Sequence, residues 1–139
     1  MEINVVYSSR TGHSKKLAQA IANELSLTAL DLKQGALPEN SDLMFLVTGI
    51  YAAKSALEVL EFIETLTPQV VKRVCLVTSS MSRTSPTTIR VLLEKKGIFV
   101  LPEEYKCRGS FLFFGMGHPT AEELGDAAQF AKEITAKSF

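Results

Sequence analysis

The residues best suited to chemistry in this sequence are hydroxyl side chains gathered around a glycine. Residues 8–14 read SSRTGHS, so four hydroxyls and Gly12 directly follow the first apolar run. Amides at a helix start, short hydroxyl donors and a glycine that permits close approach are groups that bind phosphate. Serine and threonine also cap helices, but capping needs only one hydroxyl. The run therefore favours an anion site, although it matches neither a Gly-Lys-Ser/Thr phosphate loop nor a GxGxxG motif.

Alternating strand and helix patterns must position this run. Apolar strand patterns cover residues 2–7, 27–32, 43–49, 73–79 and 98–101, and a strand pattern resumes near residues 107–113. Helical patterns cover residues 14–25, 55–66, 85–97 and 120–134, the last opening with a capping box from Thr120 to Glu123. The runs at 43–49 and 73–79 are almost continuously apolar, which is typical of strands covered on both faces. The sequence therefore predicts an α/β fold with helices on both faces of a parallel sheet.

The second helix and the link before it carry more specific expectations. Leu57, Leu60 and Ile63 share one side of the helix at 55–66, and acidic residues at 58, 61 and 64 lie beside them. We expect these three apolar residues to form the inner face. The link at residues 33–42 is too short for a crossover helix, so we expect a single turn around Leu37.

Composition and charge exclude several classes of protein. The 139 residues carry 15 basic and 15 acidic side chains, and this length predicts one domain spanning residues 1–139. The balanced charge gives no reason to expect binding to nucleic acid or anionic membranes. No run reaches the ~18 apolar residues of a membrane span, and the N-terminus does not resemble a signal peptide. Cys75 and Cys107 match no CxxC spacing, so we expect a reduced, cytoplasmic protein with Cys75 in the core.

Loops after the first, third and fourth strands should meet at the carboxyl edge of the sheet, and their residues resemble one known family. Residues 9–14 match the Thr/Ser-x-Thr-Gly-x-Thr/Ser loop of the flavodoxin family, which wraps the phosphate of FMN. Residues 41–66 are similar to the family's third strand, flavin loop and following helix, and residues 111–134 resemble its last helix. The resemblance implies a flavodoxin-like three-layer sandwich, a five-stranded parallel sheet in the order 2-1-3-4-5, and FMN at the carboxyl edge.

The resemblance assigns the candidate site residues to three groups. The phosphate would be held by the first loop: Ser9, Arg10, Thr11, Gly12, His13 and Ser14. The isoalloxazine ring would lie against the second loop: Thr48, Gly49, Ile50 and Tyr51. The third loop would contribute Ser79, Ser80 and Met81. Tyr51 could stack on the ring, and Gly49 could turn its carbonyl toward the flavin because glycine allows a peptide flip at little steric cost.

Two departures from the family pattern bear on function. The third loop has no aromatic residue to stack on the ring, and residues 8–16, 49–56 and 79–88 include no Asp or Glu. Positive charge comes instead from Arg10, Lys15, Lys16, Lys54 and Arg83. These basic residues would form a positively charged rim around the flavin site. Such a rim suits a redox partner protein with an acidic docking face, or a pyridine nucleotide.

The resemblance implies an FMN-binding electron-transfer protein that shuttles electrons between redox partners and needs no catalytic acid or base. Two alternatives stay open. One is an NAD(P)H-dependent FMN or quinone reductase of the same fold, for which the missing aromatic residue would leave space over the ring. The other is a flavodoxin-like interaction module without a cofactor, and retention of the hydroxyl loop argues against it.

Overall fold

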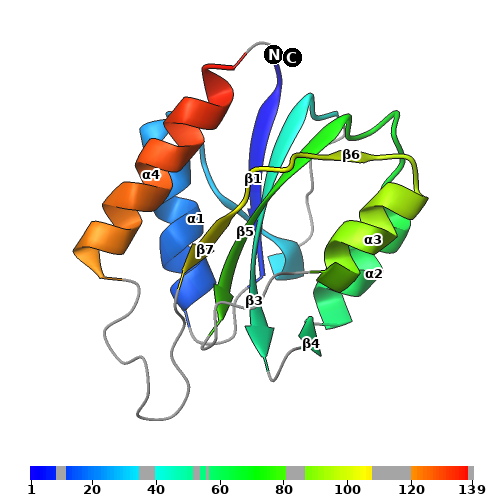
Figure 1. Cartoon of the computed structure of the whole chain (residues 1–139), viewed down its shortest axis with the longest axis horizontal. Coiled ribbons are helices and arrows are strands. Elements are labelled where there is room, and N and C mark those ends of the chain that lie inside the picture. The colour runs from blue at the N-terminus through cyan, green and yellow to red at the C-terminus, as the bar shows by residue number, and fades with distance from the viewer. Residues whose placement is uncertain are drawn as a thin grey trace.

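The computed structural model is built around a parallel sheet (Figure 1). It describes residues 1–8, 12–34, 40–51, 54–55, 57–80, 87–107 and 120–137. The long strands are β1 (Ile3–Tyr7), β3 (Leu43–Tyr51) and β5 (Arg73–Ser80), and the short ones are β2 (Leu30–Asp31), β4 (Lys54–Ser55), β6 (Phe99–Val100) and β7 (Tyr105–Cys107). The order β2-β1-β3-β5-β6, with every neighbouring pair parallel, confirms the predicted 2-1-3-4-5 topology. Strand β4 is an addition that pairs antiparallel with the end of β3.

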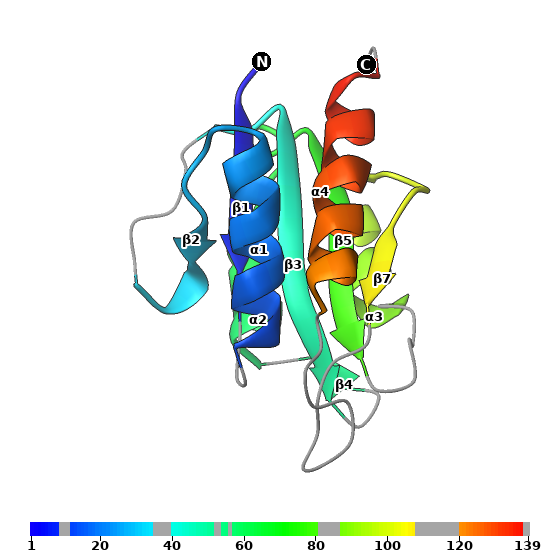
Figure 2. The same ribbon diagram turned by 90° about the vertical axis from the view of Figure 1, so that its left-hand side faces the viewer.

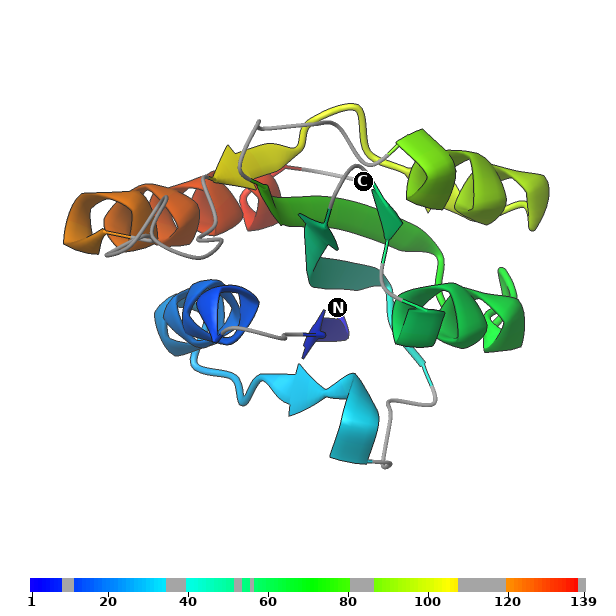
Figure 3. The same cartoon turned by 90° about the horizontal axis from the view of Figure 1, so that it is seen from below.

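Helices cover both faces of this sheet, as predicted. Helices α1 (His13–Glu24) and α4 (Ala121–Thr135) lie side by side on one face (Figure 2), and α2 (Leu57–Thr65) and α3 (Thr87–Lys95) lie on the other (Figure 3). The capping box predicted for the last helix is present, since the Thr120 hydroxyl accepts from the Glu123 amide at 3.1 Å and the Glu123 carboxylate accepts from the Thr120 amide at 2.9 Å. Among the described residues, no helix combines the length and apolarity needed to cross a membrane.

The core consists of two apolar layers separated by the sheet. Successive side chains of a strand point to opposite faces of the sheet, and Val5, Phe45 and Cys75 face α1 and α4. Val6 and Leu76 face α2 and α3. All five side chains are fully buried. Burial on both faces explains why the central strands are almost continuously apolar, as the sequence pattern indicated.

The buried face of α2 differs from the sequence prediction. Leu57 is 65% exposed, and the buried side chains are Val59, Phe62, Ile63 and Leu66, the last just beyond the helix end. These four positions follow the i, i+3, i+4, i+7 spacing of one helix face, so they form a more complete stripe than Leu57, Leu60 and Ile63. Relative to the predicted orientation, the helix is rotated about its axis so that Glu58 lies near the carboxyl end of β1.

The second strand is also shorter than predicted, because the chain before it completes the end of α1. The Leu27 amide donates to the Ala22 carbonyl at 2.7 Å, and Ser26 adopts a left-handed conformation with φ of +57°. These residues close the helix rather than pair with β1, so the ladder contains only Leu30 and Asp31. Residues 32–34 then form a 3-10 turn. The turn expected around Leu37 lies outside the described residues.

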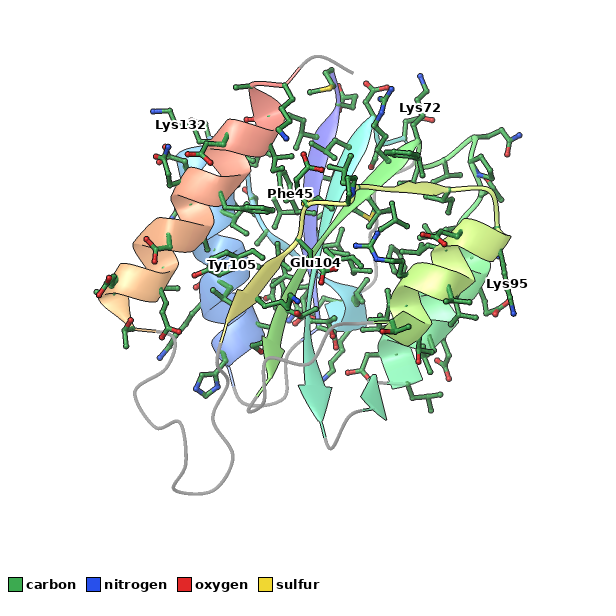
Figure 4. All side chains as sticks on the ribbon, in the orientation of Figure 1. Phe45, Lys72, Lys95, Glu104, Tyr105 and Lys132 are labelled. Carbon is green, nitrogen blue, oxygen red and sulfur yellow. The ribbon has the colours of Figure 1, made fainter. Side chains whose placement is uncertain are left out.

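The fifth strand position of the sheet is interrupted. Strand β6 pairs Val100 with Val74, and β7 pairs Tyr105 with Val77, so the outer strand has two residues more than β5 between these pairs. Arg90 of α3 holds the extra segment by donating to the Leu101 carbonyl at 3.1 Å and to the Glu104 carboxylate at 2.8 Å. Figure 4 labels Glu104 and Tyr105 in this region. The second part of the strand therefore begins at Tyr105, earlier than the predicted 107–113, and residues 108–113 lie outside the described part.

The buried thiol of Cys75 makes the stability of the fold sensitive to alkali. Burial raises the pKa of Cys75 from its ordinary value of 9.0 to about 12, and the nearby carboxylates of Glu103 and Glu104 add to the rise. Because the folded state holds the neutral thiol, this contribution to stability is complete below pH 9 and is lost as the pH rises from 9 toward 12.

We expect the free energy of unfolding to fall by about 2 kcal/mol more in the wild type than in Cys75→Ala between pH 8 and pH 10.5. Urea unfolding at both pH values measures this difference, and comparison with the variant removes the shared titration of tyrosines and of Cys107. Equal losses in the two proteins would contradict the assignment of the buried thiol.

Candidate functional site

The carboxyl ends of β1, β3 and β5 lie at the same edge of the sheet, where the first loop begins. Tyr7 is in register with Val47, and Gly49 is in register with Ser79. The Ser8 amide extends the first ladder by donating to the Val47 carbonyl at 3.0 Å. This edge is the lower end of the sheet in Figure 1, and α1 begins there. The sheet thus brings the starts of the three predicted loops together.

Gly12 ends the first loop and begins α1 in a conformation that favours glycine. Its φ is +89° and its ψ is −6°, in the left-handed region, and it occupies the N-cap position of the helix. A Cβ built on Gly12 would meet no described atom within 4 Å. The first turn of α1 contains no acidic residue and includes the exposed Lys15 and Lys16. The positive end of the helix dipole, the adjacent space and this charge balance fit an anion.

Ser14 is directed into the protein rather than toward solvent. Its side chain is 1% exposed, and its Oγ lies 3.3 Å from the Oγ of Ser79, which is 5% exposed. The sequence prediction placed Ser14 at the phosphate and assigned Ser79 to the third loop. The structure joins these two residues by one hydrogen bond across 65 positions of sequence.

The residues predicted for the second loop belong to β3. Thr48 is fully buried, and its hydroxyl donates to the carbonyl of Gly49 at 3.3 Å. Ile50 and Tyr51 extend the strand and pair antiparallel with β4, so β3 is two residues longer than the predicted 43–49. Ser79 and Ser80 likewise end β5. The strand termini, rather than loop residues, therefore supply much of the polar edge.

Glu58 is a site residue that sequence reasoning missed. The Ser8 hydroxyl, which is buried, donates to the Glu58 carboxylate at 2.7 Å, and Lys33 Nζ lies 3.8 Å from the same carboxylate oxygen. The acid-free segment after β3 ends at residue 56, two positions before Glu58, and the sequence pattern placed Glu58 only beside the apolar side of the helix. The apolar stripe at 59, 62, 63 and 66 was the signal that could have placed Glu58 at the edge. The rim is therefore mixed in charge at this point.

Comparison with known families identifies the family and its fold. A family model described as a flavodoxin domain matches residues 4–106 of the chain. The chain belongs to the flavodoxin family. It therefore has the fold of flavin-binding electron-transfer proteins. No curated protein matches it in sequence.

Solved flavodoxins share this architecture over nearly the entire chain. A flavodoxin from Streptococcus pneumoniae TIGR4 is 17% identical with a TM-score of 0.71, covering 99% of this chain and 100% of that one. A flavodoxin from the domain Archaea is 16% identical with a TM-score of 0.72, covering 96% of each chain. An NAD(P)H:quinone oxidoreductase from Methanothermobacter marburgensis is 12% identical with a TM-score of 0.70, covering 100% of this chain and 98% of that one. At such identities the likeness concerns the fold.

The structure places part of the predicted site of this flavodoxin. Gly12, His13, Ser14, Thr48, Gly49 and Ser79 are described with their surroundings, and all belong to the carboxyl edge. Only the backbone pairing is described for Ile50, Tyr51 and Ser80. Ser9, Arg10, Thr11 and Met81 lie outside the described residues. The roles given to all of these residues stay predictions.

Proposed function

We propose that this flavodoxin binds FMN noncovalently and carries electrons between redox partner proteins. The observation that supports the proposal best is the left-handed Gly12 at the start of α1, where no described atom lies within 4 Å of an ideal Cβ. A phosphate dianion suits this position because the helix dipole is positive there and the first turn carries no carboxylate. In the family pattern, Ser9, Thr11 and Ser14 would supply hydroxyl donors, and Arg10 and His13 would supply amides.

The protein's own contribution would be binding and orientation. Bound FMN would supply the redox chemistry, because the flavin itself accepts and releases the electrons. Thr48 restrains the Gly49 peptide through its hydrogen bond to that carbonyl, and both residues are buried. Such restraint controls which backbone groups β3 presents at the edge, where the ring would lie. No acid or base is required by this role.

We expect the purified chain to quench FMN fluorescence in a saturable titration. Riboflavin, which lacks the phosphate, should bind about tenfold to a hundredfold more weakly, since the phosphate contacts are charge-assisted hydrogen bonds. Equal affinities would contradict the role of the first loop. Unchanged FMN fluorescence with excess folded protein would contradict cofactor binding and favour an interaction module.

A reductase of the same fold is the second candidate. The fold of this chain is similar, over almost the full length of both chains, to that of an NAD(P)H:quinone oxidoreductase. This similarity is the reason to test for reductase activity. The two functions differ in the electron donor, which is NAD(P)H for a reductase and a separate reductase protein for a carrier. Oxidation of NADPH by the FMN-loaded chain alone would support a reductase. Reduction only after a separate reductase protein is added would support the carrier.

The proposed partner is a protein with an acidic docking face. Lys15 and Lys16 are exposed in the first turn of α1, beside the proposed phosphate position. Charges on such a rim accelerate encounter with an oppositely charged surface, and salt screens this effect. If the partner reduces the protein at a rate that does not depend on ionic strength, an acidic docking face is contradicted.

A further inference from the structure

A buried pair of hydroxyls joins the first turn of α1 to the end of β5. Ser14 and Ser79 bring their Oγ atoms within 3.3 Å, and their side chains are 1% and 5% exposed. Strand alternation supports this direction, because Cys75 and Val77 of the same strand face α1 and α4. Ser79 follows them on that face. The contact thus connects a helix and a strand that border two of the predicted loops at the carboxyl edge.

The direction of this hydrogen bond determines what Ser14 can offer to a ligand. Each hydroxyl has one proton, and in a single bond between two hydroxyls only one proton is used. If Ser79 donates, Ser14 accepts and keeps its own proton for a third group. An anion at the N-terminus of α1 requires donors, so its binding favours this arrangement over the reverse.

We propose that Ser79 is a positioning residue for the phosphate end of the site and acts through Ser14. This inference rests on the proposed binding of FMN. It gives Ser79 a specific role, whereas the family resemblance only assigned this residue to the third loop. Ser79 holds the Ser14 oxygen in place, and the Ser14 hydroxyl proton is then directed to the phosphate.

Loss of Ser79 would release Ser14 to other partners. A serine hydroxyl that has lost its partner can turn to a nearby backbone group instead, and its proton is then unavailable to a ligand. Because both side chains are buried, bulk water does not simply replace the missing hydroxyl. The effect should therefore appear in ligands that carry a phosphate and be absent in those that do not.

We expect Ser79→Ala to weaken FMN binding about tenfold and to leave riboflavin binding unchanged. The two dissociation constants are measured by fluorescence titration under the same conditions. Thr78→Val is the matched control, since Thr78 is the adjacent residue of β5, is 1% exposed and is replaced by a side chain of similar shape. Thr78 projects from the opposite face of the strand, so its variant should retain the wild-type ratio of the two constants. Thermal unfolding of both variants verifies that they fold.

A double-mutant cycle tests whether Ser79 acts through Ser14. Ser14→Ala and the double variant Ser14→Ala/Ser79→Ala should have the same FMN affinity, because Ser79 has no function once the Ser14 hydroxyl is gone. Additive losses would overturn the inference, as would an equal loss of riboflavin affinity in Ser79→Ala, which would indicate contact with the ring. A wild type that does not bind FMN would overturn the proposed function itself, whereas these two outcomes would leave it intact.

Discussion

Gly12→Ala is expected to weaken FMN binding about a hundredfold, the largest effect we predict on ligand affinity. Gly12 adopts a φ of +89°, and the space beside it holds no described atom within 4 Å of an ideal Cβ. An added methyl group would occupy space that the phosphate needs. Relief of the backbone strain would also turn the amides at the start of α1 away from the ligand. Fluorescence titration with FMN measures the loss.

Gly97→Ala provides a control with similar backbone strain. Gly97 has a φ of +81° and lies beyond α3, away from the carboxyl edge. Both variants should lose about 1 kcal/mol or more of stability, because L-residues are disfavoured in the left-handed region. The Gly97 variant also brings a Cβ to 3.3 Å from Pro68 Cγ, so its loss of stability should be at least as large. Reduced FMN affinity in both variants, in proportion to stability, would refute a specific role for Gly12.

Phe45→Ala is expected to lower the free energy of unfolding by about 3–5 kcal/mol. Phe45, labelled in Figure 4, is fully buried as the third residue of β3 and is in register with Val5 and Cys75. Its ring belongs to the layer between the sheet and helices α1 and α4. Truncation removes apolar contacts with the neighbouring strands and with the two helices, and it leaves a cavity that the surrounding strands cannot close. Urea unfolding monitored by circular dichroism measures the change.

Phe99→Ala is the matched control because the same residue type stands in a strand at the sheet edge. Phe99 is 57% exposed, so its truncation should change stability by no more than about 0.5 kcal/mol. FMN should raise the midpoint of Phe45→Ala unfolding, since a ligand that binds only the folded state stabilises it. Similar losses of stability in the two phenylalanine variants would show that the core assignment is wrong.

Several elements of the fold were predictable from neighbouring residues. The near-continuous apolar runs of β3 and β5 indicated burial on both faces, and the two buried apolar layers on either side of the sheet confirm it. The capping box from Thr120 to Glu123 marked the start of α4. The position of Gly12 within a hydroxyl-rich run of sequence also indicated where α1 begins. These signals are local, because a strand face, a cap or a turn depends on residues a few positions apart.

Other features depended on how distant elements pack. Glu58 reaches Ser8 only because α2 buries Val59, Phe62 and Ile63. The interruption between β6 and β7 depends on Arg90 from α3. Neither contact has a signature within a short window of sequence, since the side chains come from elements whose rotation and register are set by the whole core.

The order of strands and helices, and the location of a hydroxyl-rich segment after the first strand, were already determined by the sequence. Apolar periodicity and backbone preferences encode such features over short distances. Tertiary structure decided that Ser14 meets Ser79, and that a carboxylate joins the rim at Ser8. Those partners are selected by the packing of α1 and α2 against opposite faces of one sheet, where a rotation of either helix would exchange one neighbour for another.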